Sequence, residues 1–585
     1  MAFQNSPGVS VAEVDQTASI PTIVTTAGAY AGPFVWGPVN KRIPVSSEQD
    51  LAAKFGNPDT NTFTSFFSAA SFLAYGNNLT VVRAANNTFS YNADGNTSNQ
   101  IHIANEDVFE VTKLFTSSNN SFGAFAARYP GVLGNSLSVS VVDANTYSST
   151  WNINTIGVSA YFPVKPGTSA QAAAAGGAND QIHLVVMDTG GLFTGTKNTV
   201  LETFPFLSKA VDARDSLGNP NYYKTAIFNN SKYIYAVDPV EYVNTSNTLL
   251  ATAQSLVANG ANAVWGSNLA NSRFITLSTA QTVDLSGGAD ANTQDSDIIT
   301  AWSKFNNVDE VNVSLLITGD ESIAVQQTVI DLASTRKDCI AFVSPPSTSV
   351  VNQSGSEVTK ITDWNTSLAR SSSYAVADSG WKYMFDRYNN VYRYVPLNGD
   401  TAGLCAYTDS VRDPWYSPAG YNRGNLRNVV KLAWNPTQSQ RDSLYALGVN
   451  PVVTMQGAGT MLYGDKTLQS QPSAFDRINV RRLFIVLEKT IATASKYSLF
   501  EFNDSFTQSQ FVALVTPFLR DVKGRRGIYD FQVVCDSTNN TPGVVDANQF
   551  VGDIYIKPAR SINYIQLNFV AVRTGVSFNT IVGSV

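Results

Sequence analysis

The chain has 585 residues, and because domains mostly run to about 100–200 residues, we expect three or four of them. Charged residues make up only 14% of the chain, and 39 basic against 45 acidic side chains give a formal charge of −6. Coating nucleic acid needs a basic face and crossing a membrane needs roughly 18 consecutive apolar residues, so we expect neither direct nucleic acid binding nor membrane insertion.

The first ninety residues predict alternating α/β structure. Residues 5–15 form a Pro-Gly break and an extended segment without a nearby hairpin partner, which must pair with a distant strand or with another chain. A short helix is expected to begin at Ser46, whose spacing from Gln49 is that of a capping box. A second helix around 62–75 and a buried strand over 79–84 follow.

Between 91 and 280 the composition shifts to Asn, Ser, Thr and Gly. Two runs, 137–142 and 182–187, have the apolar, β-branched character of strands. The Ala/Gly stretch at 170–178 is expected to be a flexible loop, and helical periodicity is visible only near 247–259. We interpret this region as one or two β-rich domains inserted into the surrounding fold.

After residue 283 the pattern becomes regular again. A buried strand over 311–317, a helix over 321–336 and a strand over 339–343 make a βαβ unit, which predicts a parallel sheet. Two longer helices are expected over 475–496 and 504–522, the second with a kink at its proline, Pro517. The chain then returns to extended segments, so it begins and ends with strand-like tails.

The residues that most enzymes use are scarce in this sequence. Cys339, Cys405 and Cys535 are far apart and suggest buried, reduced thiols in place of a disulfide framework or a zinc site. The two histidines, His102 and His183, stand beside no nucleophile motif. The N-terminus, MAFQNSPGVS, also lacks the features of a signal peptide. We therefore expect a non-enzymatic protein without metal or cofactor.

The nearest approach to a phosphate-binding loop is GAGTMLYGDKT at 457–467. Asp465 occupies the position that the P-loop lysine requires, and a carboxylate there would repel phosphate. A strand over 460–463 between glycine turns is the simpler interpretation. Paired carboxylates of a hydrolase need not be close in sequence, so this alternative stays open, without any constellation of residues in its support.

One basic cluster stands out at the end of the last predicted helix: Arg520, Lys523, Arg525 and Arg526. Cations at a helix C-terminus are favoured by the helix dipole, which gives a purely structural explanation. Alternatively, the cluster is a positive patch for an acidic partner surface. Three further arginines lie nearby in sequence and could extend it: Arg477, Arg481 and Arg482.

Several segments, taken in order, carry a resemblance to a known family: SPGVSVAEVD (6–15), GPVNKRIPVSSEQDLAAKFG (37–56), SFLAYGNNLTVVRA (71–84), LSGGAD (285–290), RKDCIAFVSPP (336–346), DPWYSPAGYNRGNLRNVVKLAWNPT (413–437), QGAGTMLYGDKT (456–467), RRLFIVLEKTIATASKYSLFEFND (481–504) and CDSTNNTPGVVDANQFVGDIYIKPARSINYIQLNFVAVRTG (535–575). Together they resemble contractile tail sheath proteins of large contractile-tailed bacteriophages. The resemblance covers roughly 1–90 and 280–585, whereas the insertion matches only in places such as ARYPGVLGNSLSV (127–139).

The resemblance implies a multidomain α/β and α+β fold. Its parts would be an N-terminal arm (1–20), an α/β middle domain with a parallel sheet (21–90 plus 281–470), β-rich outer domains (91–280), an α+β inner domain facing a tail tube (471–573) and a C-terminal arm (574–585).

Family subunits stack as hexameric rings, and their arms add strands to a sheet in a neighbouring subunit. The resemblance therefore implies a helical sheath of copies of this chain, contracting without a nucleotide to drive the tube through the host envelope for genome ejection. The residues expected to form the inter-subunit arm strands are Pro7, Gly8, Val9, Val11, Val576 and Phe578.

The partners implied are further copies of the chain, the tail tube protein, and baseplate and tail terminator proteins. The cluster from Arg520 to Arg526 is the expected tube contact. The protein would belong to the virion tail and assemble in the host cytoplasm. Two other interpretations remain open: the sheath of a tailocin or secretion-type injection system, and a β-rich surface adhesion protein.

Overall fold

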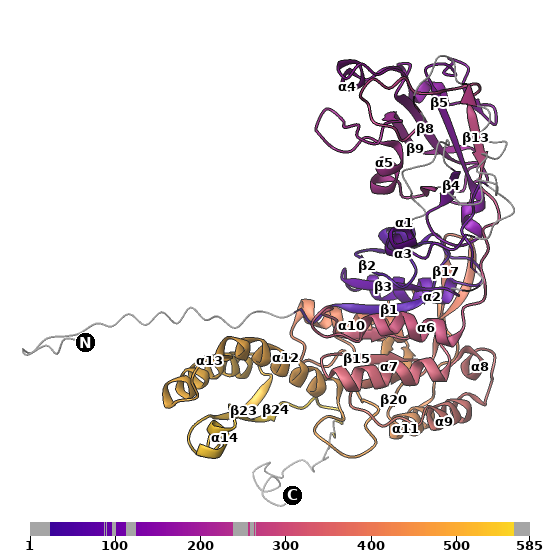
Figure 1. Cartoon of the computed structure of the whole chain (residues 1–585). Coiled ribbons are helices and arrows are strands. Elements are labelled where there is room, and N and C mark those ends of the chain that lie inside the picture. Colours follow the sequence, from indigo (N-terminus) through magenta and orange to yellow (C-terminus); the bar gives the residue numbers. More distant parts are fainter. Residues whose placement is uncertain are drawn as a thin grey trace, which may run out of the picture. The chain divides into compact units, whose positions relative to one another are not determined.

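The computed structural model describes residues 24–86, 88, 90–95, 101–112, 124–237, 256–257, 263, 265–564 and 566 (Figure 1). The chain divides into two compact units. The main unit holds the described residues up to Asp413 together with Pro418–Arg481, and the C-terminal unit holds Pro414–Ser417 and the described residues from Arg482 onward.

A seven-stranded sheet organises the main unit, in the order β2-β3-β1-β14-β15-β16-β20. All neighbours pair in parallel except β2, an antiparallel edge strand. The predicted parallel sheet is therefore confirmed. The strands are β1 (Gly28–Pro33), β2 (Arg42–Val45), β3 (Leu79–Ala84), β14 (Leu315–Ile317), β15 (Ile340–Val343), β16 (Ala375–Asp378) and β20 (Val449–Asn450).

Helices pack on both faces of this sheet, as a parallel sheet requires. Buried side chains of α6, α7, α9 and α11 form one apolar core with small strand residues such as Ala29 and Ala341. On the other face α2 and α10 pack closely, because Gly399 lies where a Cβ would come 2.2 Å from the Ser68 carbonyl oxygen. The helices are α1 (Glu48–Phe55), α2 (Phe63–Leu73), α6 (Asp295–Trp302), α7 (Ile323–Arg336), α8 (Ser347–Val350), α9 (Glu357–Leu368), α10 (Asn398–Val411) and α11 (Gln438–Ala446), with a 3₁₀ turn at Ser303–Phe305.

The predicted start of α1 is wrong by one residue. The N-cap is Ser47, whose Oγ accepts a hydrogen bond from the Asp50 amide at 3.1 Å. The Asp50 carboxylate in turn accepts from the Ser46 amide at 3.0 Å. Asp50 thus bonds to the residue before the cap, so the predicted capping box between Ser46 and Gln49 is wrong as well.

The insertion is built on an antiparallel sheet in the order β13-β5-β8-β9. The predicted loop at 170–178 is partly wrong, since Ser169 caps a short helix, α4 (Ala170–Ala174). The predicted helix near 247–259 lies mostly outside the described residues, and Leu256–Val257 form strand β11. The other elements are α3 (Glu106–Thr112), β4 (Ala124–Ala127), β5 (Leu137–Asp143), β6 (Asn152–Ile153), β7 (Ile156–Gly157), β8 (Gln181–Asp188), β9 (Thr199–Ser208), α5 (Tyr223–Asn230), β10 (Ile234–Val237), β12 (Thr276–Leu277) and β13 (Gln281–Asp284), with 3₁₀ turns at Val132–Ser136 and Val158–Tyr161.

Two small antiparallel sheets complete the main unit. One has the order β18-β17-β19, from β17 (Trp381–Asp386), β18 (Val391–Pro396) and β19 (Lys431–Leu432). The other is a hairpin of β21 (Val452–Met455) and β22 (Gly459–Leu462). The glycine-rich stretch at 457–467 therefore contains a strand after a tight turn, as the simpler interpretation predicts.

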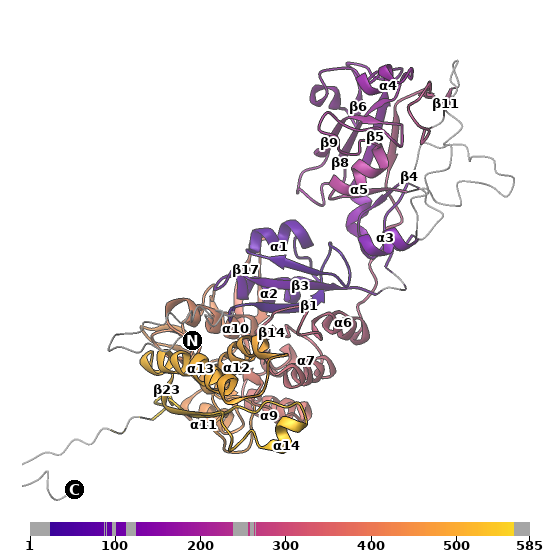
Figure 2. The same cartoon turned by 60° about the vertical axis from the view of Figure 1, so that its left-hand side comes forward.

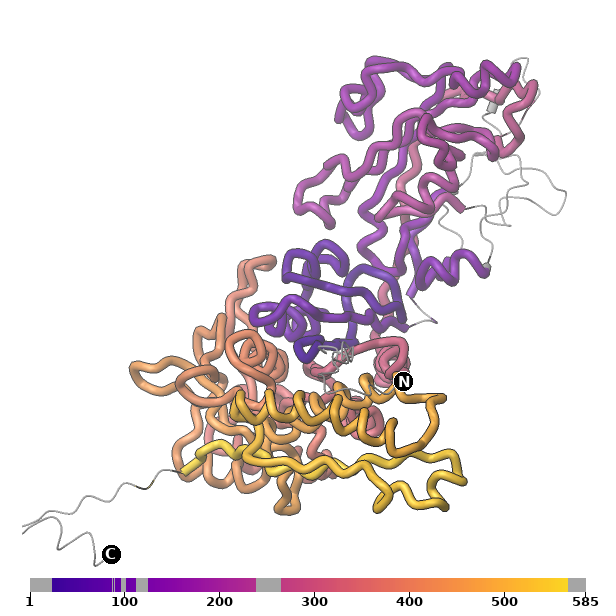
Figure 3. Tube along the Cα trace, turned by 90° about the vertical axis from the view of Figure 1, so that its left-hand side faces the viewer, coloured from indigo at the N-terminus to yellow at the C-terminus, as the bar shows by residue number. Residues whose placement is uncertain are grey.

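Two long helices and a β-hairpin make up the C-terminal unit (Figures 2 and 3). Helix α12 (Ile478–Ser495) enters it at Arg482, and a 3₁₀ turn (Lys496–Ser498) leads to α13 (Ser505–Gly524). The Asp504 carboxylate caps α13 by accepting from the Thr507 amide at 2.8 Å. Strands β23 (Ile528–Val534) and β24 (Asp553–Pro558) pair antiparallel, with α14 (Pro542–Asp546) in the connection between them.

Candidate functional site

The hairpin of the C-terminal unit is a sheet of only two strands within the described part of the chain. Each strand therefore has one neighbour and one edge without a strand partner there, and such an edge is a template for pairing with another chain. Gln532 lies opposite Tyr555, and a register shift between Ile528 and Asp530 marks a bulge. The exposed fraction of Tyr555 is 60%.

The face of the hairpin opposite to Tyr555 packs on α12 and α13, but these helices cover it only in part. Phe531, Val533, Ile554 and Ile556 contact the core of the unit but stay half-buried. Two strands alone are marginally stable, and further strands would cover more of these side chains. The hairpin thus has the geometry of an incomplete sheet.

The residues predicted to complete such a sheet lie outside the described residues. These are the arm positions Pro7, Gly8, Val9, Val11, Val576 and Phe578. The hairpin is therefore a candidate for the sheet that receives the exchanged strands, whereas the arms that would supply these strands stay a prediction.

The basic cluster lies at the end of α13, where all four side chains are exposed. Lys523 Nζ pairs with Asp530 Oδ1 at 2.8 Å, and this ion pair holds the pKa of Asp530 below its usual value. The Arg525 guanidinium lies 3.5 Å from Asp521 Oδ2 and 5.1 Å from the centre of the Trp415 ring. Arg520 and Arg526 have no ion pair among the described residues. Two of the four positive charges are thus balanced within the unit.

The predicted extension of this cluster by three further arginines is wrong. Arg481 and Arg482 are buried, and the Arg481 guanidinium stacks 3.9 Å from the Phe475 ring centre and 4.2 Å from that of Tyr374. Arg477 hydrogen-bonds the Tyr445 hydroxyl at 2.6 Å. Arg477 and Arg481 fill cation–π positions inside the fold, which sequence spacing alone does not distinguish from surface charge.

An exposed apolar patch, which sequence reasoning missed, lies between α12 and α13. We call it the α12–α13 patch, and its members are Tyr497, Leu499, Phe500, Phe502 and Phe506. The exposed fractions of Phe500 and Phe502 are 105% and 85%. Phe500 also has φ 70°, a left-handed conformation that costs an L-residue about 1–2 kcal/mol. Several large apolar side chains exposed along one short segment make it a candidate interaction surface.

The carboxyl ends of the parallel strands, where α/β enzymes bind their ligands, hold a buried polar network here. Asp378 accepts hydrogen bonds from Ser344 Oγ at 2.7 Å and from the Gly380 amide at 2.9 Å, and burial raises its pKa to about 8. Lys382 and Asp400 form a buried ion pair at 2.7 Å. These groups satisfy one another inside the core, so we assign them to fold stability.

The other sequence candidates for chemistry also have structural roles. Phe206 donates its amide to His183 Nδ1 at 3.0 Å, and Nε2 lies 2.7 Å from the Val164 carbonyl. Asp465 is buried beside Tyr445 and Arg477. In the part of the chain that is described, no cluster of three potential metal ligands occurs, and none of its helices has the length and hydropathy to span a bilayer.

Three family models match consecutive parts of the chain. The "Tail sheath protein Gp18 domain III N-terminal region" matches residues 25–84, which contain β1 to β3. The "Phage tail sheath protein central domain" matches 291–468, and the "Phage tail sheath C-terminal domain" matches 470–571. The last of these covers the hairpin, the basic cluster and the α12–α13 patch.

Full-length relatives agree with these matches. The chain is 33% identical to the tail sheath protein of Vibrio phage KVP40 and 34% identical to that of Enterobacteria phage T4, with 99% of each chain covered in both cases. The solved sheath tail protein of Listeria innocua shares the fold, with a TM-score of 0.52 at 10% identity over 92% of this chain and 96% of that one. The chain therefore belongs to the tail sheath protein family of contractile-tailed bacteriophages.

Proposed function

We propose that copies of this sheath subunit stack as hexameric rings around a tail tube and are linked by exchanged strands. In this proposal the arms at 1–20 and 574–585 of one copy pair with the free edges of β23 and β24 in its neighbours. The observation that carries the proposal is the two-stranded, half-covered hairpin. It is supported by the alternating apolar positions of both arms, such as Val9 and Val11.

Strand addition suits a lattice that must change shape without coming apart. Backbone hydrogen bonds supply strength, and alternate side chains set the register. The contact is head-to-tail and does not close on itself, so it generates a helical array. During contraction the linked strands would act as hinges while the packed units rotate and form new contacts, with no catalytic step.

We propose the α12–α13 patch as a contact with a second copy of the chain. A sheath subunit works only as one of many copies, and solvent-exposed Phe500 and Phe502 would be covered in such a lattice. A left-handed Phe500 is costly in the free subunit, and strain of this kind is typical of functional positions.

For the tube contact we propose the basic cluster, with Arg520 and Arg526 as its unpaired charges. An exposed ion pair contributes about 0–1 kcal/mol, which suits a contact that has to break during contraction. Baseplate and tail terminator proteins would bind the two ends of the sheath, with assembly in the host cytoplasm and the product in the virion tail.

Electron microscopy of two versions of the chain tests the strand exchange. The full chain should form tubes with helical striations, whereas a chain that lacks residues 1–15 and 574–585 should stay monomeric with an unchanged circular dichroism spectrum. Identical tubes from both chains would refute the strand exchange, although the family assignment would stand.

A further inference from the structure

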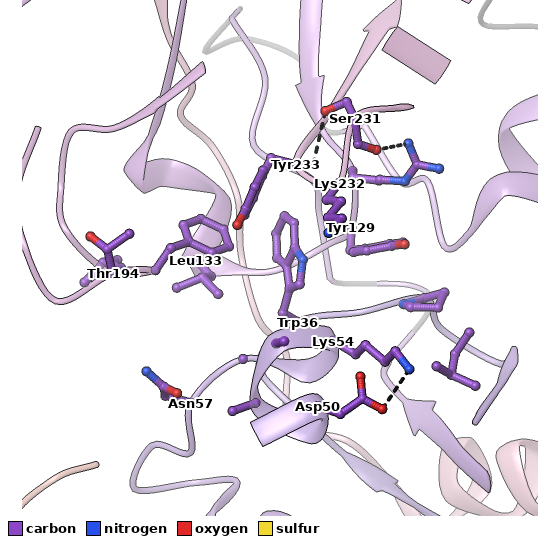
Figure 4. Close-up of a pocket in the computed structure, with 18 of the residues that line it drawn as sticks. Trp36, Asp50, Lys54, Asn57, Tyr129, Leu133, Thr194, Ser231, Lys232 and Tyr233 are labelled. Carbon is purple, nitrogen blue, oxygen red and sulfur yellow. Dashed lines mark hydrogen bonds and ion pairs between the residues drawn. The ribbon is translucent and has the colours of Figure 1, made fainter. Parts of the chain in front are cut away.

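The main unit contains a cavity of about 560 Å³ where the insertion meets α1, far in sequence from the C-terminal unit. This volume is in the range of small-molecule sites, which run to about 300–1,000 Å³ and favour domain junctions. Figure 4 shows Trp36 at its centre, with Tyr233 above it, Tyr129 beside it and the Asp50–Lys54 pair below.

The walls of the cavity are held in place by buried polar contacts. Arg83, a buried residue of β3, donates to the Phe34 and Gly37 carbonyls at 2.8 and 2.9 Å. The same guanidinium donates to the Pro130 carbonyl of the insertion at 2.9 Å. The insertion is therefore fixed against the strand that leads to Trp36, and the cavity is preformed.

One side of the cavity is aromatic. The Trp36 ring makes edge-to-face contacts with Tyr129 and Phe193 at centroid distances of 5.2 and 4.9 Å. Phe193 makes a similar contact with Tyr233 at 5.2 Å. Rings held at right angles to one another present both faces and edges to a ligand.

The acidic side chains around the cavity are already neutralised. Asp50 pairs with Lys54 at 2.9 Å, and Glu106 pairs with Arg128 at 2.6 Å and with Lys41 at 3.1 Å. A cationic ligand would therefore find aromatic rings but no free carboxylate, which disfavours an ammonium group.

Three hydrogen-bond donors of the cavity wall have no acceptor of their own among the residues described. Trp36 is only 4% exposed, yet its Nε1–H has no acceptor within hydrogen-bonding distance among the residues described. The hydroxyl of half-buried Tyr233 and the ammonium group of exposed Lys232, both from the cavity wall, also lack an acceptor there. These donors are open to the cavity and have no acceptor of their own, so a ligand that supplies acceptors would be favoured.

We propose that this cavity binds a pyranose unit of a saccharide that carries a carboxylate. The C–H face of a pyranose ring is apolar and suits the aromatic wall, and its hydroxyl and ring oxygens accept from Trp36 Nε1 and the Tyr233 hydroxyl. The carboxylate pairs with Lys232. This is a binding function of the outer part of the chain, separate from the strand exchange.

Calorimetric titration of the full chain tests the proposal with two matched pairs of ligands. The ligands are digalacturonic acid against its neutral galactose disaccharide, and a glucuronic acid disaccharide against its neutral glucose counterpart. We expect at least one acidic disaccharide to bind, about twofold to fivefold more tightly than its neutral partner, because a partly exposed ion pair contributes at this level.

Three variants then separate the roles of the cavity groups. Lys232→Gln should remove the preference for the acidic sugar and keep binding, whereas Lys197→Gln, at an exposed lysine elsewhere in the insertion, should change nothing. Trp36→Phe keeps a ring and removes the N–H, so it should weaken binding of acidic and neutral sugars alike, with the melting temperature as a folding check. The proposal would be overturned if neither acidic disaccharide binds at concentrations on the order of 10 mM, or if the affinities are unchanged in Lys232→Gln. Tube formation by these variants should stay normal in every case.

Discussion

Phe500 offers a substitution in which subunit stability and assembly should change in opposite directions. Its left-handed φ of 70° costs about 1–2 kcal/mol, and glycine adopts this conformation freely. Phe500→Gly should therefore stabilise the isolated subunit by up to about 1 kcal/mol after the entropy that glycine loses on folding. The fully exposed ring makes no buried contact that the free subunit would lose.

In the assembled sheath the same substitution removes a side chain that we place between copies. Burial of a phenylalanine contributes about 1.5–3 kcal/mol, and each 1.4 kcal/mol is a factor of ten in an equilibrium constant. The concentration needed for polymerisation should thus rise about tenfold to a hundredfold. Sedimentation of tubes measures this concentration, and urea unfolding of the monomer measures stability.

A matched control removes exposed apolar surface elsewhere. Leu217 is 85% exposed in the insertion, so Leu217→Gly should leave polymerisation unchanged. An unchanged polymerisation threshold in Phe500→Gly would refute the proposed role of the α12–α13 patch, even if the monomer becomes more stable as expected.

Three further predictions concern charged groups. Burial raises the pKa of Asp378 to about 8, against about 3.9 in the unfolded chain, so between these pH values the folded state keeps a proton that the unfolded chain releases. The free energy of unfolding should therefore fall by about 1.4 kcal/mol per pH unit as the pH rises through this range. Urea titrations of Asp378→Asn should lack this slope. Arg520→Glu combined with Arg526→Glu should impair assembly on tail tubes at an unchanged melting temperature, unlike the control Arg560→Glu, and normal assembly would contradict the tube contact. Arg83→Met, which removes a buried guanidinium bonded to four carbonyls, should cost about 3–5 kcal/mol in denaturant unfolding, and a loss below 1 kcal/mol would contradict its role in holding the insertion.

Much of the sheet in the main unit is predictable from the sequence because its signals are local. Buried parallel strands read as continuous apolar runs, and the strand over 79–84 agrees with β3 (Leu79–Ala84). The strand predicted over 339–343 likewise agrees closely with β15 (Ile340–Val343). Ends are less certain, as the shift of the cap from Ser46 to Ser47 shows, because two adjacent serines offer the same chemistry.

The surfaces were harder to predict because they depend on tertiary packing. Arg481 has the composition of surface charge but stacks on two rings that come from different parts of the chain. Phe500 and Phe502 fall between two predicted helices, and only the fold shows that they face solvent. The side chains that line the aromatic cavity around Trp36 are likewise far apart in sequence, so no sequence motif predicts the cavity.

Disulfide scanning between copies tests the strand exchange most directly. Gln532 and Tyr555 lie opposite each other on the hairpin, and both are exposed. A cysteine at one of these positions in one chain can be combined with a single cysteine at each position from 8 to 14 in a second, differently tagged chain. Neighbouring strands bring side chains on one face to about 4.5–5.5 Å, close to the geometry of a disulfide, and successive residues alternate between faces. Strand exchange predicts cross-links between the two chains at every second arm position, in tubes and not in monomers. Cross-links only within one chain, or without this alternation, would contradict it.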